Sequence, residues 1–174
     1  MEQVVLLNES LAPCGIMPKS KVHTTNTPLH LAFSCYLLND KNELLMTRRS
    51  LNKKAWPGVW SNSFCGHPLP DESLSSAVHR RGQWELGVDA QDIQLIDNSF
   101  RYEATDTNGI KENEYCPIFI AKTSATPALN PDEAMDYQWV HYMLVLELVA
   151  HAPRLISPWM SMQLKNSNLQ LYIR

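Results

Sequence analysis

The sequence predicts a layered domain of mixed α/β or α+β class. Apolar runs rich in strand-forming residues alternate with a few segments of helical periodicity. The chain has 174 residues, which fits one domain over residues 1–174, because domains commonly contain about 100–200 residues. No internal repeat, linker or low-complexity tract divides it. This pattern favours helices packed against a mixed sheet.

The expected strands are short and bounded by turn-forming residues. The turn Asn-Asp-Lys-Asn at residues 39–42 joins two strands of a hairpin. Segment 9–29 is predicted to be a loop, because it contains Pro13, Gly15, Pro18 and Pro28. We expect strands at residues 3–8, 30–38, 43–48, 59–64, 93–102, 114–123 and 136–141.

One long helix is expected from Asp71 to about Leu86. Asp71 is a suitable N-cap residue, and Gly87 is suited to the position just after a helix. The apolar stripe of this helix consists of Leu74, Ala77 and Val78. Residues 142–150 and the tail from Ser157 onward are also expected to be helical.

Composition and charge exclude several classes of function. The formal net charge is -3, so the chain lacks the basic character expected of a nucleic-acid-binding protein. No run approaches the ~18 apolar residues of a membrane span. The N-terminal segment has neither the basic nor the apolar part of a signal peptide. We therefore expect a soluble cytoplasmic protein without a nucleic-acid or membrane partner.

The four cysteines contain no CxxC pair, which argues against a zinc ribbon or a thioredoxin-type site. We expect Cys14 and Cys35 to be buried as small apolar residues. Cys65 differs, because it lies beside Gly66 and His67 where a strand meets a loop. A thiol next to a cationic or metal-bound group can become reactive.

Three histidines near predicted turns could form a metal site. His23, His30 and His67 each offer a neutral imidazole, although a lone histidine is more often structural. Glu112 and Glu114 are two residues apart in a predicted strand and therefore point to the same face. The three histidines and two glutamates together would make a site of three nitrogens and two carboxylates, which suits Mn²⁺, Mg²⁺ or Zn²⁺.

The same two glutamates could instead belong to a solvated strand face, which is the usual place for glutamate. The neighbouring Ile118 and Ile120 make this strand a poor candidate for an exposed one. Two interpretations also exist for Glu85, which lies within ~20° of the apolar stripe. It could pair with Arg81, four residues earlier, or bind a metal at the bottom of a pocket.

The segment from Leu44 to Lys54 contains no acidic residue and four basic ones, Arg48, Arg49, Lys53 and Lys54. It could be a solvated loop or part of a phosphate-binding site. A tryptophan near the C-terminus, Trp159, could be a core residue or could face a cation.

Part of the chain resembles the Nudix box. Gly66, Glu72, Arg80 and the run Glu-Leu-Gly-Val at 85–88 match its pattern. However, Arg81 and Trp84 occupy two positions where the box has metal-binding glutamates, and Gly82 occupies an apolar position. One remaining glutamate could not hold the two or three divalent ions of a Nudix hydrolase, so the departures argue against that activity.

The chain as a whole resembles the type I isopentenyl-diphosphate delta-isomerases. The resemblance implies a Nudix-type fold, with a mixed β-sheet sandwiched between helices, and interconversion of isopentenyl and dimethylallyl diphosphate. The stretches that carry the resemblance span most of the chain and comprise residues 23–30, 47–49, 53–60, 62–68, 101–102, 112–114, 136–139 and 157–160.

The resemblance also implies roles for individual residues. The ligands of the catalytic metal, Mn²⁺ with Mg²⁺ or Zn²⁺ as alternatives, would be His23, His30, His67, Glu112 and Glu114. Glu85 would lie near a second ion, Mg²⁺, bound to the substrate diphosphate. The residues implied in acid–base chemistry and cation stabilisation are Cys65, Glu114, Tyr102 and Trp159. The diphosphate would bind to Lys19, Arg49, Lys53 and Arg81.

Two other functions are compatible with parts of the sequence. A Nudix pyrophosphohydrolase acting on a nucleoside diphosphate derivative would release phosphate. A metal-binding module without catalysis would leave Cys65, Tyr102 and Trp159 without a role. We expect a small allylic or homoallylic diphosphate as the partner and a monomeric protein.

Overall fold

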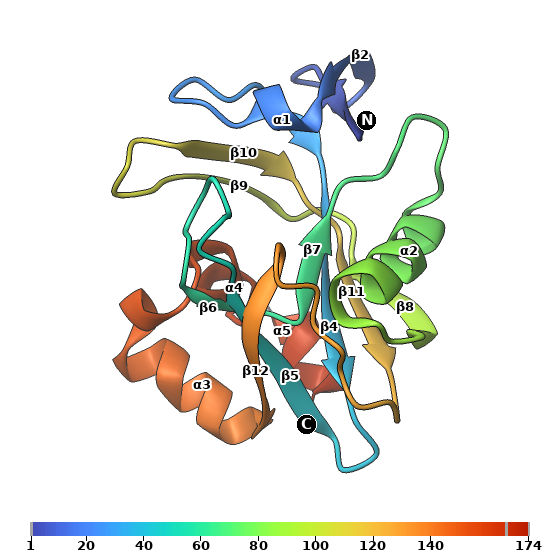
Figure 1. Cartoon of the computed structure of the whole chain (residues 1–174), viewed down its shortest axis with the longest axis vertical. Coiled ribbons are helices and arrows are strands. Elements are labelled where there is room, and N and C mark those ends of the chain that lie inside the picture. The colour runs from blue at the N-terminus through green and yellow to red at the C-terminus, as the bar shows by residue number, and fades with distance from the viewer. Residues whose placement is uncertain (1, 166, 174) are drawn as a thin grey trace.

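The computed structural model describes residues 2–165 and 167–173 (Figure 1). The strands are β1 (Gln3–Leu7), β2 (Pro13–Pro18), β3 (His30–Leu31), β4 (Phe33–Leu38), β5 (Glu43–Arg49), β6 (Trp60–Ser61), β7 (Phe64–Gly66), β8 (Gln91–Asp97), β9 (Arg101–Thr105), β10 (Lys111–Tyr115), β11 (Ile118–Lys122) and β12 (Ala134–His141). The helices are α1 (Lys19–Val22), α2 (Leu74–Leu86), α3 (Tyr142–His151), α4 (Pro158–Gln163) and α5 (Ser167–Tyr172), with a 3₁₀ turn η1 (Pro153–Leu155).

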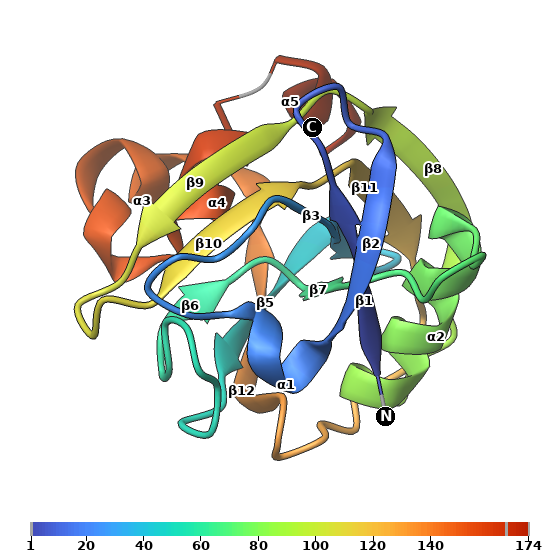
Figure 2. The same cartoon turned by 90° about the horizontal axis from the view of Figure 1, so that it is seen from above.

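These strands form two sheets. The larger sheet has the order β12-β5-β4-β11-β8, with β6 paired to β5 and β7 paired to β4. It is mixed, because β11 runs parallel to β4 while its other pairs are antiparallel. The smaller sheet has the order β2-β1-β3-β10-β9 and crosses above the larger one (Figures 1 and 2).

The central strand of the larger sheet, β4, is buried on both faces. Alternate residues of β4 point to opposite sides, so Phe33, Cys35 and Leu37 pack with α2. Tyr36 and Leu38 point to the opposite face, where they belong to an apolar cluster that includes residues of α3, α4 and α5. Figure 1 shows α2 on one side of this sheet and α3 and α4 on the other. The predicted mixed sheet sandwiched between helices is confirmed.

The expected loop at residues 9–29 is partly wrong, because it contains β2 and α1. Pro13 and Pro18 are the end residues of β2, which is the edge strand of the smaller sheet. Proline is tolerated there because an edge strand leaves backbone donors unpaired. The expected burial of Cys14 is also wrong, because its position on this edge strand leaves it exposed. Cys35 is buried as predicted.

The expected strands 93–102 and 114–123 are each divided in two. The Asp97 side chain accepts hydrogen bonds from the backbone and hydroxyl of Ser99 at 2.7 and 2.6 Å, which forms a turn between β8 and β9. Pro117, which has no backbone donor, separates β10 from β11. Short breaks likewise divide segments 30–38 and 59–64. The strands expected at 3–8, 43–48 and 136–141 are present as β1, β5 and β12.

The long helix begins later than predicted. Ser73, not Asp71, is its N-cap, and the Ser73 side chain accepts a hydrogen bond from the Ser76 backbone. Gly87 ends the helix in the left-handed conformation, as expected. The helix at 142–150 is present as α3, and the helical tail is present as α4 and α5, while residues 166 and 174 lie outside the described part. No helix in the described part is long and apolar enough to cross a membrane.

Candidate active site

Glu114 is placed by the register of the smaller sheet. On β10 it is opposite His30 of β3 on one side and Tyr102 of β9 on the other. The Tyr102 hydroxyl donates a hydrogen bond to Glu114 Oε2 at 3.0 Å. Glu114 Oε1 lies 3.4 Å from His30 Nε2 and 3.3 Å from His67 Nε2. The sheet therefore gathers a carboxylate, two imidazoles and a phenol from residues far apart in sequence.

The third histidine completes a cluster of possible metal ligands. His23 lies directly after α1, and His67 directly after β7. One donor atom from each of His23, His30, His67 and Glu114 lies within 4.8 Å of the others. Glu112 is outside this set of four, but its Oε2 lies 3.1 Å from His23 Nε2. The predicted ligands are therefore together, with Glu112 at the side of the cluster.

The donor atoms fit a divalent metal ion. His30 Nδ1 lies 2.9 Å from the Pro28 carbonyl, to which it can donate, leaving Nε2 as a free lone pair facing Glu114. His30 Nε2 and Glu112 Oε2 are both buried without a hydrogen-bond partner. Buried polar atoms are rarely left in this state, and a cation in the cluster would satisfy them. The donor types do not distinguish among Mn²⁺, Mg²⁺ and Zn²⁺.

Burial and the neighbouring charged or polar groups compete in setting the pKa values of this cluster. Burial lowers the pKa of His67 to about 3 and that of His23 to about 4, so both rings are neutral and can act as ligands. Burial, together with the charge of Glu114, raises the pKa of Glu112 to about 8. Burial also opposes ionisation of Glu114, but the adjacent His30 and His67 imidazoles outweigh it and hold the Glu114 pKa well below its usual range.

Cys65 and Trp159 are joined through Asn62. The Cys65 thiol donates to Asn62 Oδ1 at 3.3 Å, and the Trp159 indole donates to the same atom at 2.9 Å. Burial raises the pKa of Cys65 to about 11, so the group is a neutral thiol. Trp159 is only 2% exposed, and the Arg49 guanidinium carbon lies 5.0 Å from its ring centroid. The tryptophan is thus both a buried residue and one whose ring contacts a cation.

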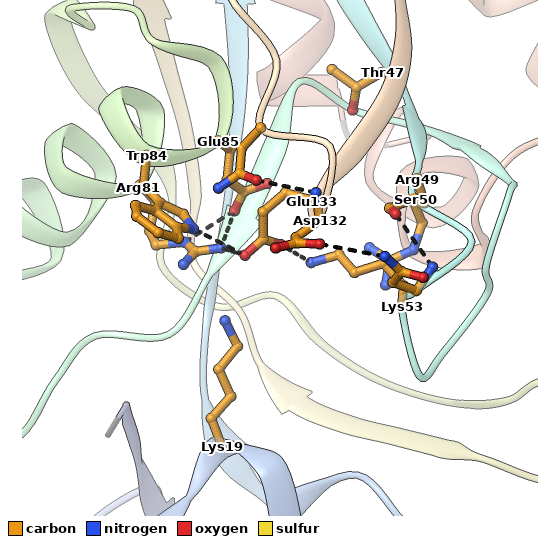
Figure 3. Close-up of polar contacts among 12 residues, drawn as sticks. Lys19, Thr47, Arg49, Ser50, Lys53, Arg81, Trp84, Glu85, Asp132 and Glu133 are labelled. Carbon is orange, nitrogen blue, oxygen red and sulfur yellow. Dashed lines mark hydrogen bonds and ion pairs between the residues drawn. The ribbon is translucent and has the colours of Figure 1, made fainter.

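A cavity of about 820 Å³ connects these groups. Of the predicted site residues, His30 alone is absent from its lining; His30 is fully buried behind Glu114. The four predicted phosphate-binding residues Lys19, Arg49, Lys53 and Arg81 line one part of it. Figure 3 shows these cations extending from different elements toward a common region. The sequence prediction of a single site that combines them is consistent with this arrangement.

Each of these four cations has a partner within the protein. Arg49 donates to the backbone carbonyls of Ala55 and Trp56. Lys19 pairs with Glu2 at 2.7 Å. Arg81 contacts Glu85 at 2.6 Å, and Lys53 pairs with Glu133. The Arg81–Glu85 pair, one of the two interpretations of Glu85 from the sequence, is thus formed, and both residues also line the cavity.

The sequence reasoning missed Glu133, which precedes β12. Its carboxylate contacts Arg81 at 2.8 Å and also pairs with Lys53. Arg80, which matched the Nudix box, binds Glu72 through two hydrogen bonds of 2.7 Å and thereby fixes the loop after His67. No local sequence pattern marks Glu133, because it follows Pro131 and Asp132 in an irregular segment. Only the pairing of β12 with β5 brings it to the site.

Comparison with known proteins identifies the family to which this chain belongs. A NUDIX domain model matches residues 28–160. The isopentenyl-diphosphate Delta-isomerase of Paenarthrobacter aurescens is 52% identical over 93% of this chain and 88% of its own length. That of Citrobacter koseri is 49% identical over 99% of this chain and 96% of its own length. The chain belongs to the isopentenyl-diphosphate Delta-isomerase family. The resemblance predicted from sequence is confirmed.

Solved structures support the fold of this isomerase family member. A Deinococcus radiodurans protein matches with a TM-score of 0.71 at 18% identity, over 94% of this chain and 98% of its own. The MutT protein of Methanosarcina mazei matches with a TM-score of 0.62 at 23% identity, over 79% of this chain and 91% of its own. At these identities the likeness concerns the fold alone.

Proposed function

We propose that the protein interconverts isopentenyl diphosphate and dimethylallyl diphosphate, a step of isoprenoid biosynthesis. The observation that carries the proposal is the placement of Glu114, hydrogen-bonded by Tyr102, in one cavity with Cys65 and a group of cations. Family membership supports the same activity. A hydrolase is a weaker candidate, because Arg81 and Trp84 occupy two of the Nudix-box glutamate positions.

The diphosphate end of the substrate would bind among Lys19, Arg49, Lys53 and Arg81. Cationic side chains on several elements can surround a phosphate group and fix its orientation. Glu85, buried beside Arg81, would contribute a carboxylate oxygen to a Mg²⁺ that accompanies the diphosphate. This arrangement would leave the hydrocarbon end of the substrate among the less polar residues of the cavity.

The reaction moves a double bond by one position. A proton adds to the terminal alkene carbon and leaves a tertiary cation, and a proton is then lost from the carbon on the diphosphate side. We assign these transfers to Glu114 and Cys65, with either residue as the acid in the forward direction. Tyr102, which donates to Glu114, would hold this carboxyl group in place or relay its proton.

The cationic intermediate needs shelter and negative charge density. The ring of Trp159 would supply a π face, and the Arg49 guanidinium carbon 5.0 Å from its centroid supports a cation-binding role for this ring. The rings of Tyr102 and Trp56 lie 5.9 and 5.5 Å from that of Trp159 and would restrict access of water. We therefore assign cation stabilisation to Trp159.

Metal ions are part of the proposal. His23, His30, His67, Glu112 and Glu114 would hold a divalent ion, Mn²⁺ or alternatively Mg²⁺ or Zn²⁺. When bound, such an ion supplies positive charge that makes a nearby protonated carboxyl group more acidic. The fit rests on the unpartnered His30 Nε2 and Glu112 Oε2.

One experiment tests this function against its alternatives. The protein is incubated with isopentenyl diphosphate, Mg²⁺ and Mn²⁺ in D₂O and followed by proton and phosphorus NMR. We expect dimethylallyl diphosphate that has taken up deuterium, with the diphosphate intact. Release of phosphate without isomerisation would support a hydrolase instead. No change, in a sample whose metal content has been verified, would favour a non-catalytic module.

We further propose that the protein acts as a monomer in the cytoplasm. All residues to which we assign a role in the reaction lie in this chain, in or directly beside one cavity, which supports a site formed within a single copy. Cys65 must remain a free thiol for the proposed chemistry, which a reducing compartment ensures. Light scattering during size-exclusion chromatography would give the oligomeric state.

A further inference from the structure

Glu133 connects two walls of the cavity. Its Oε1 accepts hydrogen bonds from Arg81 Nη2 at 2.8 Å and from Trp84 Nε1 at 3.2 Å, both on α2. Its Oε2 pairs with Lys53, in the loop after β5. Figure 3 shows Glu133 between these two groups. The Glu133 side chain is only 11% exposed, so few groups other than these three donors can reach it.

The backbone around Glu133 is attached to both walls. On one side, the Asn130 amide donates to the Glu85 carbonyl at 2.9 Å, at the end of α2. On the other, the Ser50 amide donates to the Glu133 carbonyl at 3.0 Å. The next residue, Ala134, is already paired with Arg49 in the larger sheet. These contacts therefore fix the Glu133 backbone between the two walls.

Glu2 offers a contrast within the same group of charges. It contacts the other end of the Arg81 guanidinium, Nη1, at 3.1 Å, and also Lys19 at 2.7 Å. Its side chain is 38% exposed and belongs to the N-terminal segment. An incoming diphosphate can replace an exposed carboxylate more readily than a buried one held by three donors. Arg81 Nη1 and Lys19 would thus become available to phosphate while Glu133 keeps its contacts.

We propose that Glu133 is a positioning residue that holds Arg81 and Lys53 at a fixed separation and so sets the affinity for the diphosphate group. The inference rests on the proposed function, since it assumes that these two cations bind the substrate's phosphates. Its ligand is the diphosphate group itself, whatever hydrocarbon it carries. Preorganised cations lose less freedom on binding than cations that must first be ordered.

The test compares wild-type protein with Glu133→Gln by calorimetric titration with inorganic pyrophosphate and Mg²⁺. We expect at least a tenfold weaker affinity in the variant. With isopentenyl diphosphate, KM should rise by a similar factor while kcat changes less than threefold. Asp132→Asn is the matched control, because the neighbouring carboxylate contacts Asn52 rather than Arg81 or Lys53. Thermal melting verifies that each variant is folded.

A double-mutant comparison separates positioning from general damage. If Glu133 acts through Lys53, the loss in Glu133→Gln combined with Lys53→Met should be clearly smaller than the sum of the single losses. Equal pyrophosphate affinity in wild-type and Glu133→Gln proteins, tighter binding in the variant, or additive losses would each overturn the role of Glu133. A wild-type protein that does not bind pyrophosphate would instead overturn the proposed diphosphate site.

Discussion

At the scale of single residues, three of the four thiols show how environment separates a reactive group from a structural one. Cys35 is fully buried in the apolar cluster beneath α2. Cys116 is also buried, and it shares the Ser34 hydroxyl with Cys65. Of these three, Cys65 lines the cavity and lies within hydrogen-bond distance of two polar side chains. A role in proton transfer therefore falls to Cys65.

Replacement of Cys65 by alanine should abolish isomerisation without unfolding the protein. The thiol is small and borders a cavity, so its loss removes little packing, and we expect less than about 1.5 kcal/mol of destabilisation. The measurements are turnover by NMR and unfolding by urea. Cys35→Ala is the control, with activity retained and a comparable or larger loss of stability. Full activity in Cys65→Ala would remove this residue from the mechanism.

At the scale of elements, the sequence predicted what depends on local patterns. The strand 43–48 and the end of the long helix at Gly87 follow from alternation and backbone preference, and both are present. The sequence predicts the start of that helix too early, because Asp71 and Ser73 are both suitable N-cap residues and the structure uses Ser73. Glu72 forms its contacts with Arg80 and the Leu69 amide in this turn, and Asp71 adopts a positive φ of 64°. These tertiary contacts cannot be read from a single sequence.

Gly87 ends α2 next to Ala128, in the segment that leads to Glu133, and its replacement by alanine should destabilise the protein by about 1–2 kcal/mol. Its φ of 62° is unfavourable for a residue with a Cβ atom. An added Cβ would also lie 3.1 Å from the Ala128 Cβ and 3.2 Å from its carbonyl oxygen. Urea unfolding measures the effect. Gln83→Ala, exposed on the same helix, is the control and should change stability by less than about 0.5 kcal/mol. Equal stability of the two variants would contradict the argument.

At the scale of the whole molecule, the site is assembled where the two sheets meet. Local patterns could nominate histidines and glutamates, but the assignment of their roles came from resemblance to a family. Neither route found Glu133, which is 52 residues from Arg81 and 80 residues from Lys53. The pairing of β12 with β5 places it there. Contacts of this range depend on the complete fold.

The buried ion pairs between these distant segments should make stability depend on pH. Burial disfavours ionisation of Glu133, but the charges of Lys53 and Arg81 outweigh it and hold its pKa well below its usual range. In the unfolded chain a glutamate has a pKa of about 4.3. Below that pH the unfolded state binds a proton that the folded state does not. The stabilisation from Glu133 is therefore complete above about pH 5 and decreases as the pH falls further.

A comparison of wild-type protein with Glu133→Gln isolates this contribution, because the other titrating groups are common to both. The difference in unfolding free energy, measured in urea with a metal chelator present, should be constant between pH 6 and 7. Below about pH 4, the difference in unfolding free energy between the two proteins should decrease by roughly 1 kcal/mol per pH unit. A difference that stays constant down to pH 3 would mean that Glu133 keeps no depressed pKa in the folded protein. The ion pairs that join α2 to the loop after β5 would then contribute nothing to the stability of the assembled site.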